Sequence, residues 1–101
     1  MEKIIRKTLL NADSTKRAYY RLITEEINGG FIIKKESGCE GRALHKETYF
    51  RESLVEAREL HAKKIKEKTN KKSKRKRIYY IVSDSDNTAK YLNQRITAVS
   101  A

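Results

Sequence analysis

The sequence predicts an α+β fold, in which a twisted antiparallel sheet of four to five strands carries one long helix on one face and a short helix follows at the C-terminus. Three observations predict it. Runs of aromatic and β-branched residues alternate with turn-forming residues over the first half of the chain. Residues 54–69 repeat apolar side chains at helical spacing. Only 38% of the residues are hydrophobic and 37% are charged, so the core must be thin, like one sheet under one helix.

The first two predicted strands are residues 3–10, closed by a turn at 11–14, and residues 17–24. Because side chains alternate across a strand, the second strand has two distinct faces. One face carries Ala18, Tyr20 and Leu22, and the other carries Tyr19, Arg21 and Ile23. This alternation predicts that one of these faces lies against the core.

Asn28-Gly29-Gly30 indicates a hairpin, because these residues tolerate the positive φ that tight turns require. The third predicted strand covers residues 31–36, a turn or bulge covers 37–41, and a short fourth strand covers 42–49. These segments complete an antiparallel meander.

A helix is predicted from Leu54 to about Thr69. Ser53 and Glu56 form a capping box, in which the serine hydroxyl accepts from the third helical N–H. The apolar stripe consists of Leu54, Ala57, His61 and Ile65, with Leu60 beside it, and the opposite face carries Glu56, Glu59, Lys63 and Lys66. We interpret the stripe as a core face and His61 as a packed core or boundary residue.

Residues 78–82 predict a fifth strand. Residues 83–87 are rich in Ser and Asp and predict a loop with an N-cap for a short helix, on which Ala89, Leu92 and Ile96 are regularly spaced. We therefore expect a domain at residues 1–82, which includes the basic segment 63–77, followed by a C-terminal loop and short helix at 83–101.

Several classes of protein are excluded or disfavoured by composition. No apolar run approaches the roughly 18 residues of a membrane span, and the N-terminus has no stretch of signal-peptide character. Cys39 is the single cysteine, so no internal disulfide forms. With only His45 and His61 beside it, a zinc site is disfavoured. We expect a cytoplasmic protein without cofactor or metal.

The positive charge is concentrated in one segment. Residues 1–62 carry 12 basic and 10 acidic side chains, whereas residues 63–77 carry 10 basic side chains against one acid, Glu67. The basic residues are Lys63, Lys64, Lys66, Lys68, Lys71, Lys72, Lys74, Arg75, Lys76 and Arg77. Such a block requires water or a polyanion around it. Lysines act as point charges, so the segment predicts sequence-independent contact with a nucleic-acid backbone.

Aromatic residues beside these cations could stack on unpaired bases. Tyr19 shares a strand face with Arg21, and Tyr79 and Tyr80 directly follow the basic run. Tyr19 and one of Tyr79 or Tyr80 are therefore candidates for stacking. We expect Tyr20, Phe31 and Phe50 to fill the core.

The order of strands, turn and helix resembles the WGR domain family, which occurs in poly(ADP-ribose) polymerases and in small bacterial proteins. The similar segments are residues 19–22, Gly41-Arg42, Phe50, residues 53–57 and the basic helix end at 63–69. The resemblance covers roughly residues 3–80. It implies a twisted antiparallel sheet with one helix and a DNA-binding role without catalysis.

The resemblance also implies a role for Arg42, because the arginine of the family motif contacts DNA near a break. Glu40 occupies the tryptophan position of that motif, and residues 43–46 replace its glycine-rich stretch. DNA is thus the expected partner ahead of RNA. From the residues alone, Arg42 could equally pair with Glu40 or Glu36.

Two other functions compete with a binding module. A small RNA-cleaving toxin would need a pocket of His, Tyr and Arg, to which His45 and Glu47 on one strand face could contribute. A protein–protein adaptor would use the sheet face and keep the lysines for solubility. An uncovered sheet edge could also pair with a second copy of the chain.

Overall fold

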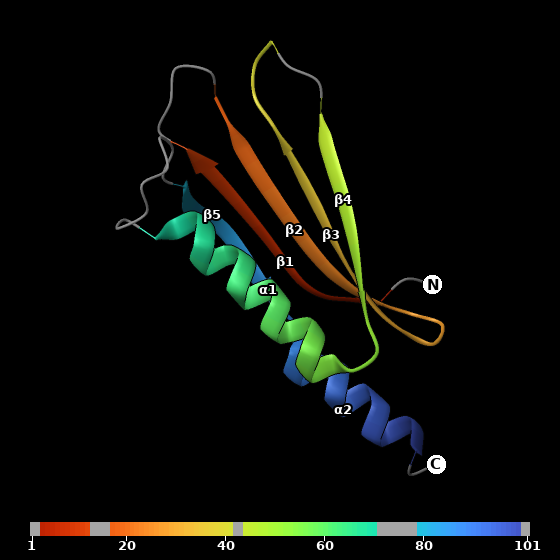
Figure 1. Ribbon diagram of the computed structural model, residues 1–101. Helices are drawn as coiled ribbons and strands as arrows, with labels where there is room; N and C mark the ends of the chain where they lie inside the picture. The colour runs from red at the N-terminus through yellow and green to blue at the C-terminus, as the bar shows by residue number, and fades with distance from the viewer. Residues whose placement is uncertain (1–2, 13–16, 42–43, 71–78, 100–101) are drawn as a thin grey trace.

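Five antiparallel strands in the order β4-β3-β2-β1-β5 form one sheet, and both helices lie on the same side of it (Figure 1). The computed structural model describes residues 3–12, 17–41, 44–70 and 79–99. The elements are β1 (Lys3–Ala12), β2 (Tyr19–Ile27), β3 (Gly30–Gly38), β4 (His45–Arg51), α1 (Leu54–Thr69), β5 (Tyr79–Asp86) and α2 (Thr88–Val99). The predicted α+β class, the long helix and the short C-terminal helix are all confirmed.

The largest difference from the prediction is the length of β5. The predicted loop at 83–87 instead continues the strand to Asp86, because Asp84 pairs with Thr8 and Asp86 pairs with Arg6 across the sheet. Aspartate disfavours strands in general, but these partners outweigh that preference. The predicted capping function is retained, since Asp86 Oδ1 accepts from the Thr88 N–H at 3.1 Å.

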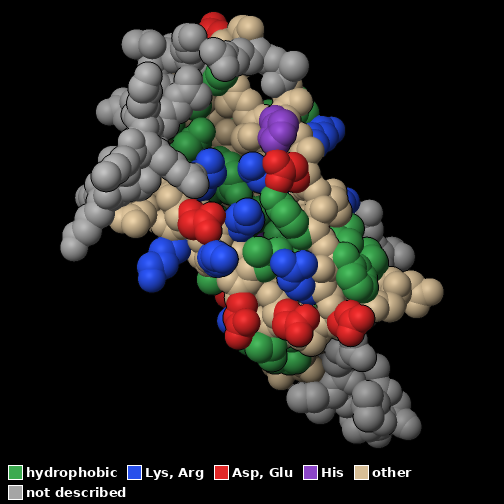
Figure 2. Space-filling view, in the orientation of Figure 1, with side chains coloured by type: hydrophobic (Ala, Val, Ile, Leu, Met, Phe, Trp, Pro, Cys, Tyr) green, Lys and Arg blue, Asp and Glu red, His purple; other side chains and the backbone are tan. Residues whose placement is uncertain are grey.

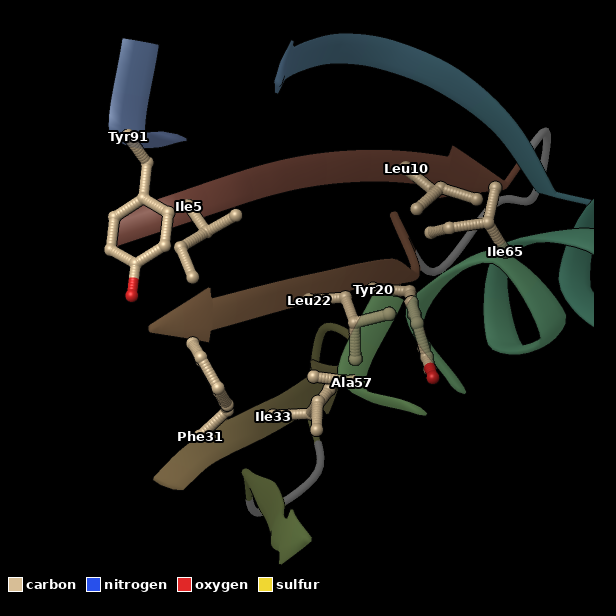
Figure 3. Close-up of a cluster of buried hydrophobic side chains, with 9 residues drawn as sticks. All are labelled: Ile5, Leu10, Tyr20, Leu22, Phe31, Ile33, Ala57, Ile65 and Tyr91. Atoms are coloured by element: carbon tan, nitrogen blue, oxygen red, sulfur yellow. The ribbon is translucent and has the colours of Figure 1, made fainter. Parts of the chain in front are cut away.

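The core lies between the sheet and α1 (Figure 3). From the sheet it takes Ile5, Leu10, Tyr20, Leu22, Phe31 and Ile33, and from the helices Ala57, Ile65 and Tyr91. The expected core position of Tyr20 and the helical stripe are therefore confirmed. Strand alternation places the remaining side chains of β2 on the other side of the sheet, which neither helix covers (Figure 1). We name this second side the open face.

Phe50 is the predicted core residue that the structure places elsewhere. Its side chain is 48% exposed, because it is paired with Ile32 on the open face, whereas its neighbour Tyr49 pairs with the buried Ile33. The expectation for Phe31 and Tyr20 is confirmed, because both are buried. Hydrophobicity alone thus assigned Phe50 to the wrong face of β4.

A chain of hydrogen bonds fixes α1 to the sheet beneath it. His61 is fully buried, and its Nδ1 and Nε2 lie 2.6 Å and 2.9 Å from the hydroxyls of Thr24 and Thr8. Thr8 donates its own proton to Asp84 Oδ1 at 2.8 Å, so it must accept from Nε2–H. Nδ1 is then the acceptor for Thr24. Arg6 completes the chain with two bonds to Asp84, at 3.1 Å and 2.8 Å.

This network needs a neutral imidazole. The pKa of His61 is lowered from 6.5 to about 4, mainly by burial and in addition by the nearby Arg6 guanidinium. The interpretation of His61 as a packed core residue is therefore confirmed. Its functional consequence is positional, because it holds α1, and the lysines that α1 carries, at a fixed place over the sheet.

The start of α1 is capped as predicted. The Glu56 N–H donates to the Ser53 hydroxyl at 3.1 Å, which satisfies one of the free N–H groups of the first turn. The turn between β2 and β3 is also confirmed, since Gly29 has a φ of 91°.

Candidate nucleic-acid interface

The second half of α1 presents the part of the basic segment that the structure describes. Lys63 and Lys66 are exposed, and Lys64 and Lys68 are half-buried. Lys and Arg side chains gather over this half of the helix, whereas acidic side chains lie near its start (Figure 2). The other predicted contacts lie outside the described residues: Arg42, Lys71, Lys72, Lys74, Arg75, Lys76 and Arg77. A rigid helix therefore carries four of the predicted cations.

Tyrosine rings hold the half-buried lysines in place. The Lys64 Nζ atom lies 4.9 Å from the centroid of the Tyr49 ring. The Lys68 Nζ atom lies 5.1 Å from the Tyr20 ring and 5.4 Å from the Tyr79 ring. The set of these residues, together with Lys35 at 5.7 Å from the Tyr20 ring, is named the lysine–tyrosine cluster. Cation–π contacts of this kind orient an ammonium group while leaving its charge available to an anion.

One carboxylate, Glu47, lies beside the lysine–tyrosine cluster. It lies 3.6 Å from Lys35 Nζ and 3.6 Å from His45 Nε2, and it accepts a short hydrogen bond from the Tyr49 hydroxyl. That hydrogen bond is the main cause that lowers the pKa of Glu47 and raises the pKa of Tyr49. Glu47 thus remains an anion and Tyr49 remains protonated near neutral pH.

The structure separates the three candidate stacking residues. Tyr79 faces α1, where its ring meets that of Tyr20 edge-on at 6.1 Å. Tyr80 is 53% exposed and is paired with Asn11 on the open face, and Tyr19 is paired with the same asparagine from the other side. Tyr19 and Tyr80 therefore remain available to a ligand, whereas Tyr79 supports Lys68.

Lys35 is a cation of the site that was not predicted from the sequence. Lys35 belongs to the lysine–tyrosine cluster because it lies on the same face of β3 as Phe31 and Ile33, four and two residues before it. This spacing of two residues in the sequence could have predicted its position. Glu36, one of the two acidic residues with which Arg42 could pair, lies 3.3 Å from Arg21 Nη1. Gly41 has a φ of 82°, consistent with a turn before Arg42.

The described residues contain no cluster of His, Cys, Asp and Glu that could hold a metal ion. Cys39 is a free, half-buried thiol. Over the same described parts of the chain, no helix has the length and apolar character needed to cross a membrane.

Comparison of the chain with protein-family models, with curated proteins and with solved structures gives no match. A function must therefore be inferred from the residues of the chain and their geometry.

Proposed function

We propose that this protein is a non-enzymatic nucleic-acid-binding module that contacts the phosphate backbone through the basic segment 63–77. The observation that carries the proposal is the arrangement of Lys63, Lys64, Lys66 and Lys68 on the second half of α1, two of them held over tyrosine rings. The helix is itself fixed to the sheet by His61. The charges are thus pre-positioned, which reduces the conformational entropy lost on binding.

Lysine chemistry favours contact with phosphates over recognition of base sequence. An ammonium group is a point charge that binds a phosphate oxygen without the paired geometry of arginine. Contacts to phosphate position a protein on the polymer but carry no sequence information. DNA is the proposed partner because of the WGR resemblance, and Arg42 is proposed to add a phosphate contact.

The test is fluorescence anisotropy of the full chain with blunt duplex DNA, nicked duplex DNA, single-stranded DNA and RNA. The double variant Lys63→Gln/Lys66→Gln should bind duplex more weakly and show a shallower salt dependence, by about 0.9 in the log–log slope for each phosphate that is no longer neutralised. Arg58→Gln/Lys90→Gln is the matched control, since both residues are exposed cations outside the proposed interface. Equal binding by both variants would overturn the proposal.

A ribonuclease is the second candidate, because β4 places His45, Glu47 and Tyr49 in a row on one face. Effective acid–base groups have pKa values near the working pH, whereas the pKa values of Glu47 and Tyr49 move away from neutrality in opposite directions. This argues for binding ahead of cleavage. Incubation of labelled RNA with the wild type and with His45→Ala decides between them: cleavage that depends on His45 would replace the binding proposal.

A further inference from the structure

The open face of the sheet is a second surface whose side chains are suited to contact a nucleic acid. It carries Tyr19 and Tyr80 at one end, and Arg21, Lys34 and Lys46 farther along the strands. Both helices pack on the opposite side (Figure 1). The basic helix that carries the proposed function does not use this face.

The two tyrosines stand in one row across three neighbouring strands. Tyr80 on β5 pairs with Asn11 on β1, which pairs with Tyr19 on β2. Neighbouring strands lie about 4.8 Å apart, so the two tyrosine positions are about 10 Å apart. The side chain of Asn11 lies between them and offers both a donor and an acceptor.

Glycine allows Tyr19 to approach the backbone of β3. A Cβ atom at Gly38 would lie 3.0 Å from the Tyr19 ring, which is tighter than ordinary contact. The ring therefore rests against β3 on one side, while the residue stays partly accessible. A pre-positioned ring loses little freedom when a base stacks on it.

A hollow of about 140 Å³ adjoins the open face. Its lining consists of four cations, two carboxylates and two uncharged residues: Arg21, Lys34, Lys35, Lys46, Glu36, Glu47, Ile23 and Thr48. Arg21 pairs with Glu36 at 3.3 Å, and the Lys34 Nζ atom lies 2.5 Å from Glu25. Lys46 is exposed and forms no ion pair with any described residue. Each carboxylate of the hollow is paired with a cation, Glu36 with Arg21 and Glu47 with Lys35, so the ammonium group of Lys46 is the one offered to a phosphate.

We propose that the open face binds a single-stranded polynucleotide, with bases stacked on Tyr19 and Tyr80 and a backbone phosphate in the hollow at Lys46. Stacking on an aromatic side chain requires a base whose flat side is free, which an intact duplex does not present. Because every base has such a side, this recognition tolerates any sequence. This inference rests on the proposed function and names its substrate class as an unpaired strand.

The experiment uses the full chain with fluorescein-labelled oligo(dT), oligo(U) and a blunt duplex. Tyr19→Leu/Tyr80→Leu should weaken binding of the single strands about tenfold or more, since each stacked base contributes substantially to affinity. Affinity for the duplex should change less than about twofold. Tyr19→Phe/Tyr80→Phe should restore single-strand binding, because phenylalanine retains the ring.

Lys46→Gln should reduce the log–log salt slope for single strands by about 0.7, the value expected for one phosphate contact. A second readout is tyrosine fluorescence, because the chain has six tyrosines and no tryptophan. Oligo(dT) should quench the wild type more than Tyr19→Leu/Tyr80→Leu. Urea unfolding of each variant confirms that the sheet is intact.

The outcomes separate the two proposals. If the wild type binds duplex and oligo(dT) and the tyrosine variant binds both unchanged, the open-face site is wrong and the basic helix remains the interface. Equal weakening for duplex and single strands would also overturn the open-face site. If the wild type binds no probe at low salt, the proposed function itself fails. Oligo(dT) and oligo(U) compared with each other show whether the strand is DNA or RNA.

Discussion

On the face beneath α1, tyrosine rings pack in the core and lysine ammonium groups lie over them, whereas on the open face tyrosines and lysines meet solvent. Two pairs of tyrosines that are adjacent in the sequence show this contrast directly. Tyr20 is buried and Tyr19 is partly exposed, and Tyr79 faces the helix while Tyr80 is exposed. Because side chains alternate along a strand, a shift of one residue along the chain moves a tyrosine ring from the core to the open face. Residue type alone therefore does not assign a function to these rings.

The sharpest test of this contrast is truncation of the two neighbouring rings on β2. Tyr20→Ala removes a fully buried ring and should lower the free energy of unfolding by about 3–5 kcal/mol. Tyr19→Ala removes a partly accessible ring and should cost about 1 kcal/mol or less. Urea denaturation followed by circular dichroism measures both. Similar losses for the two variants would contradict the assignment of the faces.

The pH dependence of stability tests the network beneath α1. The unfolded chain binds a proton at His61 near pH 6.5, and the folded chain does so only near pH 4. Stability is thus full above about pH 6.5 and should fall by on the order of 3 kcal/mol as the pH decreases toward 4. The lowered pKa values of Asp84 and Asp86 place their stabilising contribution above pH 3.8, so it is lost at still lower pH.

The control is His61→Gln, which removes the titrating group. Its free energy of unfolding should be nearly independent of pH between 6.5 and 4.5, although lower than that of the wild type. His45→Gln should keep the wild-type pH profile, because His45 is exposed. A wild type whose stability stays constant over this interval would contradict the neutral, buried imidazole.

Substitution of the two glycines at the ends of β3 tests how tightly the open face is packed at each end. A Cβ atom at Gly30 would lie 2.6 Å from the Phe50 ring and 2.9 Å from the Arg51 carbonyl oxygen. Since the backbone cannot move aside easily, Gly30→Ala should cost about 1–3 kcal/mol. Gly38→Ala meets only the Tyr19 ring, at 3.0 Å, and should cost less. Thermal unfolding ranks the two, and the reverse order would contradict the packing.

The smallest expected change in stability follows from substitution of the exposed Tyr80. Tyr80→Leu should change the free energy of unfolding by no more than about 0.5 kcal/mol, because surface substitutions away from special features have small effects. The same substitution combined with Tyr19→Leu is expected to weaken single-strand binding about tenfold or more. A large loss of stability from Tyr80→Leu would mean that the ring serves the fold.

Local patterns in the sequence predict most of the fold. The N-cap at Ser53, the hairpin at Gly29 and the alternation in β2 are local signals, and each is confirmed. The extension of β5 was not predictable locally, because Asp84 depends on Arg6, 78 residues away. Phe50 likewise depends on its pairing with Ile32.

The candidate interface was predictable only in part. The lysines of α1 follow from composition, whereas the contribution of Lys35 and the division between Tyr79 and Tyr80 depend on strand register. Register is fixed by pairing between strands, which no single segment encodes. The sequence pattern therefore identified the charges but did not separate the two faces that carry them.

If this chain binds a polyanion through pre-positioned lysines, its affinity for nucleic acid must depend steeply on salt. The most direct test is the affinity of the wild type for duplex DNA, measured by anisotropy over a series of salt concentrations. We expect a straight log–log plot with a slope of about −0.9 for each phosphate neutralised, and thus several units in total. Affinity that does not depend on salt, or no binding at low salt, would contradict binding through the lysines.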